Sequence, residues 1–149
     1  MTTAMVVWES VTGVTERFAE EIASYLKVRG LDASSISIAD CDERTLDRYD
    51  LVLFGCWTSG LLVIGQHPDK EWVEFVGKIP GLRHPRVALF TTYKVATGSM
   101  FRRMRRALEP LGARVELELK SRDGRLSDEG RKRLDAWMAL APTEGGVPG

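Results

Sequence analysis

The chain has 149 residues, of which 44% are hydrophobic and 28% are charged. These proportions fit one globular domain and exclude a chain that is disordered over most of its length. No apolar run approaches the ~20 residues of a membrane span, and residues 1–4 lack the basic start of a signal peptide, so we expect a cytoplasmic protein without membrane contact. Cys41 and Cys56 form no disulfide or zinc pattern and are expected to be thiols.

The formal net charge is zero, but the charges are unevenly distributed along the chain. Residues 1–75 contain 13 acidic and 6 basic side chains, whereas residues 76–149 contain 8 acidic and 15 basic ones. The folded surface is therefore expected to have an acidic region and a basic region, which bears on the partners of the protein rather than on its fold.

Five short runs predict β-strands. Three runs are apolar almost without interruption, as in strands that are covered on both faces, and two runs alternate apolar with polar residues, as at the edges of a sheet. In chain order the expected strands are residues 5–8, 35–38 (alternating), 51–54, 87–90 and 115–119 (alternating).

Helical periodicity separates most of these runs. Gly30 is suited to the end of the first helix, Asp69 to the start of the second and Ser127 to the N-cap of the last, while residues 41–49 hold at most a short helix. The expected helical stripes lie at residues 14–26, 72–79, 101–111 and 134–141.

The alternation of strands and helices indicates an α/β fold of three αβα layers with a five-stranded parallel sheet. Of the two common doubly wound orders, 2-1-3-4-5 places the second and fifth strands at the edges, where the two alternating runs belong. We expect residues 1–141 to form this domain and the Gly/Pro-rich residues 142–149 to be a flexible tail. Ligands bind beyond the carboxyl ends of such strands, so the loops after the first, third and fourth strands are the candidate site.

The first of these loops passes directly from a strand into a helix. Its hydroxyl groups, its glycine and the free N–H groups of the first helical turn suit a phosphate, and the absence of any basic residue before Arg17 excludes a P-loop. A second interpretation remains open, in which the Ser and Thr side chains only cap the helix. The candidate residues are Glu9, Ser10, Val11, Thr12, Gly13, Val14 and Thr15.

Residues 10–15 resemble the flavodoxin phosphate loop, [ST]-x-T-G-x-T, in the same place between the first strand and the first helix. The resemblance covers residues 4–141 and is closest to the short-chain members, because nothing interrupts the fifth strand. It implies a flavodoxin-like fold, FMN bound without a covalent link, and an electron transfer protein that shuttles single electrons from a reductase to an acceptor enzyme.

The resemblance also implies that the other two loops line the flavin ring. The loop after the third strand departs from the family pattern G-x-P-T-W-x-x-G, with Trp57 in place of proline and Ser59 in place of tryptophan. The apolar residues 61–64 that follow cover the ring, form an apolar docking surface or enter the core. Cys56 is expected near the ring, as a buried structural thiol rather than a reactive one. The expected ring-binding residues are Cys56, Trp57, Thr58, Ser59, Gly60, Thr91, Thr92, Tyr93, Thr97 and Gly98.

Two of these assignments have a structural alternative, in which Tyr93 packs on a neighbouring helix and Thr97 and Gly98 only begin the next helix. The arginines of that helix are either a solvated face or a docking patch for a redox partner, and they lie away from its apolar stripe. Flavodoxins usually meet partners through acidic surfaces, so the resemblance implies a non-standard partner. The four residues are Arg102, Arg103, Arg105 and Arg106.

We expect a monomeric electron carrier without catalytic or metal-binding residues, since His67 and His84 have no partner pattern for either role. Nucleic-acid binding is not expected of a neutral chain without interleaved basic and aromatic residues. Two other functions remain open: an enzyme on the same fold, such as a quinone reductase or a protoporphyrinogen oxidase, and an interaction domain without flavin.

Overall fold

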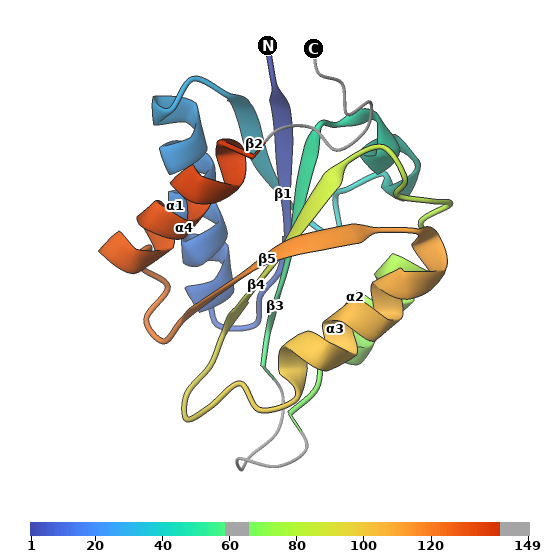
Figure 1. The fold of residues 1–149 in the computed structure, drawn as a ribbon. Coiled ribbons are helices and arrows are strands. Elements are labelled where there is room, and N and C mark those ends of the chain that lie inside the picture. The colour runs from blue at the N-terminus through green and yellow to red at the C-terminus, as the bar shows by residue number, and fades with distance from the viewer. Residues whose placement is uncertain (59–65, 141–149) are drawn as a thin grey trace.

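The computed structural model describes residues 1–58 and 66–140. It contains one sheet of five parallel strands in the order β2-β1-β3-β4-β5 (Figure 1), which confirms the predicted order and the two predicted edges. The strands are β1 (Thr3–Glu9), β2 (Asp32–Ser37), β3 (Leu51–Trp57), β4 (Arg86–Thr92) and β5 (Arg114–Ser121).

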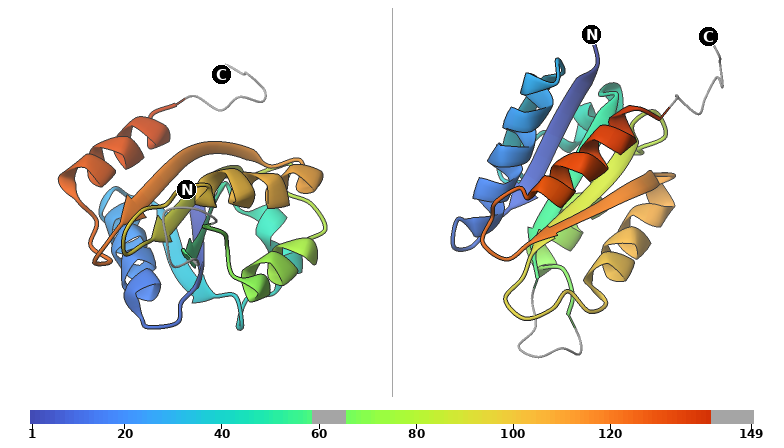
Figure 2. Two further views of the ribbon diagram at one scale, coloured as in Figure 1. Left: turned by 90° about the horizontal axis from the view of Figure 1, so that it is seen from below. Right: turned by 60° about the vertical axis from the view of Figure 1, so that its left-hand side comes forward.

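Helices cover both faces of this sheet (Figures 1 and 2). Helices α1 (Val14–Val28) and α4 (Asp128–Met138) pack on one face, and α2 (Lys70–Gly77) and α3 (Met100–Leu108) pack on the other. None of the helices in the described ranges is long and apolar enough to cross a lipid bilayer. The described residues also form two short 3-10 helices, η1 (Glu43–Arg48) and η2 (Glu109–Leu111).

The helix boundaries follow from local chemistry. The Asp69 carboxylate accepts the N–H of Glu71 at 3.3 Å at the start of α2, and the Ser127 hydroxyl accepts the N–H of Gly130 at 3.0 Å at the start of α4, as predicted. The expected helix over residues 101–111 is shorter than predicted. Its α-helical part ends at Leu108, because Pro110 has no N–H to donate, and η2 follows.

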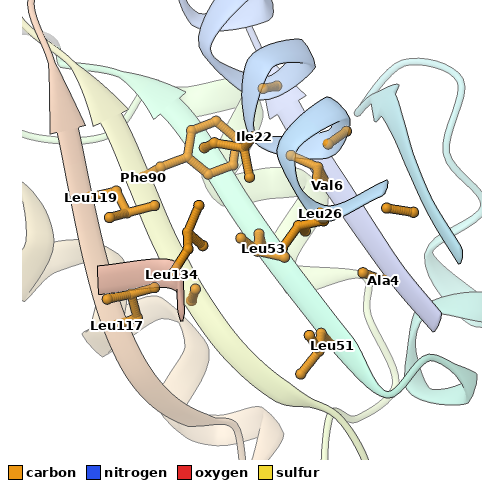
Figure 3. Close-up of a cluster of buried hydrophobic side chains, with 14 of the residues drawn as sticks. Ala4, Val6, Ile22, Leu26, Leu51, Leu53, Phe90, Leu117, Leu119 and Leu134 are labelled. Atoms are coloured by element: carbon orange, nitrogen blue, oxygen red, sulfur yellow. The ribbon is translucent and has the colours of Figure 1, made fainter. Parts of the chain in front are cut away.

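The two faces of the sheet have separate apolar cores. Figure 3 shows the core beneath α1 and α4, where Ile22 and Leu134 meet Val6, Leu53 and Phe90 of the central strands. Every one of these five side chains is buried. The core on the other face lies beneath α2, α3 and η1, so the central strands are covered on both faces, as their continuous apolar runs predict.

Gly55 allows β3 and β4 to pack at the centre of the sheet. It lies opposite Phe90 in the β3–β4 register, and the Phe90 ring meets the Phe18 ring of α1 edge to face at 5.6 Å. A Cβ atom at Gly55 would overlap the Phe90 ring. The aromatic pair therefore requires a residue without a side chain at this position.

We expect Gly55→Ala to lower the free energy of unfolding by about 1–3 kcal/mol or more, because the new methyl group displaces the Phe90 ring. Gly77→Ala is the matched control, since a Cβ there meets no atom within 4 Å, and alanine should stabilise that helical position by about 0.5–1 kcal/mol. Urea unfolding of both variants checks the expectation. If Gly55→Ala were as stable as the unchanged protein, packing would not require a glycine at this position.

Candidate functional site

The carboxyl ends of β1, β3 and β4 lie side by side at the lower end of the molecule in Figure 1. The register pairs Glu9 of β1 with Cys56 of β3, and Cys56 with Thr91 of β4. The three loops that the sequence predicts as the candidate site therefore begin at the same level of the sheet and border one site.

The β1–α1 loop has the geometry of an anion site. Gly13 is the N-cap residue of α1 in a left-handed conformation (φ 94°), and no side chain of the described residues caps the helix. The Ser10 hydroxyl instead accepts the N–H of Gly13 at 2.9 Å within the loop, which leaves Val11 and Thr12 exposed. The capping interpretation is therefore wrong for this loop, and the first turn of α1 keeps its N–H groups and positive dipole end for a ligand.

A set of threonine hydroxyls connects the three loops. The Thr15 and Thr92 hydroxyl oxygens lie 2.6 Å apart, and those of Thr58 and Thr91 lie 2.8 Å apart. Thr91 donates its one hydroxyl hydrogen to the carbonyl of Cys56 at 2.6 Å. Thr58 must therefore donate to Thr91, so both hydroxyl hydrogens of this pair are engaged within the protein. In the Thr15–Thr92 pair one hydroxyl donates to the other, and the second hydrogen remains available for a ligand.

Glu9 and Cys56 contact each other on the α2/α3 face of the sheet. Glu9 is only 7% exposed, and the Cys56 thiol donates to its carboxylate at 3.3 Å while accepting the N–H of Asp69 at 3.4 Å. Burial, followed by the neighbouring Asp69 carboxyl, raises the pKa of Glu9 to about 7, and burial raises the pKa of Cys56 well above its usual value. Cys56 is therefore a buried structural thiol, as predicted, and its expected place near the flavin ring stays a prediction.

The same corner contains a group of three carboxylates. Oxygen atoms of Glu9, Asp69 and Glu71 all lie within 4.8 Å of one another, a spacing at which carboxylates repel unless a proton or a cation is shared. A proton on Glu9 relieves this repulsion.

The second loop is described only at its two ends. Trp57 packs against the core beneath α2 and α3, and its buried indole N–H has no hydrogen-bond partner among the described residues. Ser59, Gly60 and residues 61–64 lie outside the described residues, so their predicted positions against the flavin ring stay predictions.

In the third loop, Tyr93 is half-buried and is contacted by cations from the end of β5. The Nζ atom of Lys120 lies 5.7 Å from the centroid of the Tyr93 ring, and the guanidinium carbon of Arg122 lies 5.6 Å from it. These two cations were not anticipated, because they follow the tyrosine by 27 and 29 residues and only the strand order brings them next to it.

The loop ends at the start of α3, which is tied to the end of the second loop. Ser99 is the N-cap residue, but its hydroxyl donates to the carbonyl of Gln66 at 2.7 Å instead of capping the helix. Arg103 donates to the same hydroxyl at 3.0 Å. Thr97 and Gly98 precede this link, and they line a surface cleft together with Arg102 and Arg105 of α3.

Comparison with known proteins identifies the family. Residues 6–137 match the family model for flavodoxin, and the flavodoxin of Megasphaera elsdenii is 30% identical over 112 residues, which span 74% of this chain and 79% of that protein. The chain belongs to the flavodoxin family. The flavodoxin of Clostridium beijerinckii is 32% identical over 98 residues, or 65% of this chain and 69% of that protein.

The fold agrees with this assignment. The solution structure of two-electron reduced Megasphaera elsdenii flavodoxin has a TM-score of 0.76 to this structure at 26% sequence identity, over 88% of this chain and 94% of that chain. Flavodoxins carry FMN and transfer electrons, so this flavodoxin is an FMN-binding electron transfer protein.

The residues of the β1–α1 loop fit the phosphate of FMN. Free space surrounds Gly13, where even a Cβ atom would meet nothing within 4 Å, and the uncapped N-terminus of α1 lies beside it. Thr12 is exposed in the loop, and the Thr15–Thr92 pair supplies one further hydroxyl hydrogen. Arg17 donates to the carbonyl of Asp123 at 3.3 Å, so the nearest cation is engaged elsewhere. Hydroxyl and N–H donors are the groups that this loop offers to an anion.

Glu9 makes the stability of this flavodoxin depend on pH. Its pKa is raised from 4.5 to about 7 in the folded state, so the unfolded chain releases this proton first as the pH rises. The free energy of unfolding should therefore fall by about 3 kcal/mol between pH 4.5 and pH 7 on account of Glu9 alone, and this loss should persist above pH 7.

Glu9→Gln keeps the shape of the side chain but carries no charge at any pH. The free energy of unfolding of the variant should exceed that of the unchanged protein by a difference that grows between pH 5 and pH 8. This difference should reach about 3 kcal/mol at most. Urea unfolding at several pH values measures the difference. Parallel stability profiles of the two proteins would show that Glu9 is ionised in the folded state throughout this range.

Proposed function

We propose that this flavodoxin shuttles single electrons from a reductase-type donor to an acceptor redox enzyme, as a monomer in the cytoplasm. The reducing conditions of that compartment suit its two unpaired and buried cysteines, Cys41 and Cys56. The observation that carries the proposal is the uncapped N-terminus of α1 at the carboxyl edge of the sheet, with hydroxyl groups around it.

The β1–α1 loop holds the FMN phosphate in this proposal. The N–H groups of the first turn of α1 donate to the phosphate, and the positive end of the helix dipole favours its negative charge. Ser10 keeps the loop in shape through its bond to Gly13, and Thr12 and Thr15 donate their hydroxyl hydrogens. Because the N–H groups and Thr15 belong to helix α1, which packs on the sheet, these donors need little rearrangement to bind the phosphate.

The flavin ring lies between the second and third loops in this proposal. Trp57 ends strand β3 and Tyr93 follows the adjacent strand β4. Thr58 donates its N–H to the carbonyl of Thr92 at 2.9 Å, which holds the two loops together at their base. Bound FMN supplies the one-electron redox chemistry. The protein holds the ring, limits its contact with water and leaves part of it accessible to partners.

Thr12→Val and Thr15→Val test the phosphate site. Each variant should bind FMN roughly 10- to 150-fold more weakly, because a lost hydrogen bond to a charged group costs about 1.5–3 kcal/mol. Riboflavin lacks the phosphate, so its affinity should change little. Fluorescence titration of flavin-free protein with each ligand measures both constants.

Thr58→Val is the matched control for these variants. It also removes a hydroxyl from the site, but this hydroxyl is bonded to Thr91 beneath the second loop. The control should change the affinities for FMN and riboflavin by the same factor. If Thr12→Val and Thr15→Val also weakened both ligands equally, the phosphate would bind elsewhere.

A further inference from the structure

Figure 2 (right) shows the edge strand β5 between helices α3 and α4. Residues of these three elements line a basic cleft. Its volume is about 490 Å³, and its walls come from both helices, from β5 and from the loop that precedes α3. Four of its lining residues are cations and one is an acid. The lining residues are Thr97, Gly98, Phe101, Arg102, Arg105, Glu118, Lys120 and Arg133.

Most of the positive charge in this cleft is not neutralised. Arg105 pairs with Glu118 at 2.7 Å, and this pair cancels. Arg102 and Arg133 are exposed and have no ion pair or hydrogen bond to another described residue. The Lys120 ammonium lies against the Tyr93 ring and forms no ion pair with an acidic side chain of the described residues. Three unpaired cations from three different elements therefore surround the cleft.

We propose that this cleft is the docking site for an acidic segment of the redox partner, a chain with several separated Asp or Glu side chains. The identification of the occupant as a redox partner rests on the proposed electron transfer function. The charges of the cleft and of such a segment are complementary, and three cations on three elements suit three carboxylates spaced along an extended chain.

The composition of the cleft favours protein carboxylates over nucleic acid. The Arg105–Glu118 pair shows that the cleft already holds one carboxylate with good geometry. Because this pair is already neutral, the cleft offers three cations on three elements, which suit separated carboxylates on flexible side chains better than a closely spaced row of phosphates. Half-buried Phe101 offers an apolar surface to the aliphatic parts of Glu side chains.

The cleft also adjoins the site proposed for the flavin. Thr97 and Gly98 belong to the third loop, and Lys120 contacts the Tyr93 ring of the same loop. A partner segment in the cleft would therefore bring its redox centre to the side of the protein on which the flavin ring is proposed to lie.

Binding of a blocked hexaglutamate peptide to the full-length protein tests this inference, measured by calorimetry with and without FMN. The cleft variant Arg102→Gln/Lys120→Gln/Arg133→Gln should bind the peptide at least about 10-fold more weakly than the unchanged protein. The matched control is Arg103→Gln/Arg106→Gln/Lys132→Gln, which removes the same charge from exposed residues of α3 and α4 that do not line the cleft. Its affinity should change by less than about 3-fold.

Two further measurements complete the test. The affinity of the unchanged protein should fall steeply as salt is raised from about 0.02 M to 0.3 M, since exposed charges are screened. Amide chemical shifts of Thr97, Gly98 and Lys120 should move on peptide addition, and hexathymidylate should bind more weakly than hexaglutamate.

Equal losses in the two triple variants, or tighter binding of hexathymidylate, would overturn the inference. Peptide binding needs no flavin, so it also separates this inference from the proposed function. A protein that binds the peptide in the cleft but does not bind FMN would overturn the proposed function alone, whereas FMN binding without peptide binding would overturn the docking site alone.

Discussion

Strand β3 is hydrogen-bonded to β1 on one side and to β4 on the other, and its residues from Leu51 to Cys56 are buried. Because all three strands run in parallel and in register, their carboxyl ends reach the same edge of the sheet together. The proposed phosphate loop, the two loops proposed to bind the flavin ring and the threonine bonds between them all depend on this pairing. Gly55 makes it possible, since any side chain there would displace the Phe90 ring that joins β4 to α1.

The same pairing brings polar groups into a region that the sheet otherwise fills with apolar side chains. In the Thr15–Thr92 pair one hydroxyl donates to the other, and Glu9 keeps a proton up to about pH 7. The carboxyl edge is therefore less stable than a fully apolar end would be. That cost is typical of a site whose donors must be in place before the ligand arrives.

Most of the fold was predictable from the sequence, because apolar runs, alternation and capping residues are local signals. The shortening of α3 was not predicted, although Pro110 carried the signal. Glu9, which precedes the predicted phosphate loop, shares with Val7 the face covered by α2 and α3, as two-residue alternation along β1 would indicate. Its predicted part in cofactor binding stays a prediction. The basic cleft had no local signal, since Arg102, Lys120 and Arg133 meet only through the packing of α3 and α4 beside β5.

Because of the strand order, the uneven charge distribution along the sequence becomes an uneven charge distribution on the surface. In the order β2-β1-β3-β4-β5, the acidic first half of the chain supplies the three strands on one side of the sheet, and the basic second half supplies the two on the other. A chain with zero net charge thus has opposite charges on its two flanks, and it orients an approaching partner without attracting it from all sides. An acidic partner would be turned toward the β5 flank, where the basic cleft and the third loop lie next to each other. Orientation of this kind raises the rate of productive encounter without requiring tight binding, which suits a carrier that must also leave its partner.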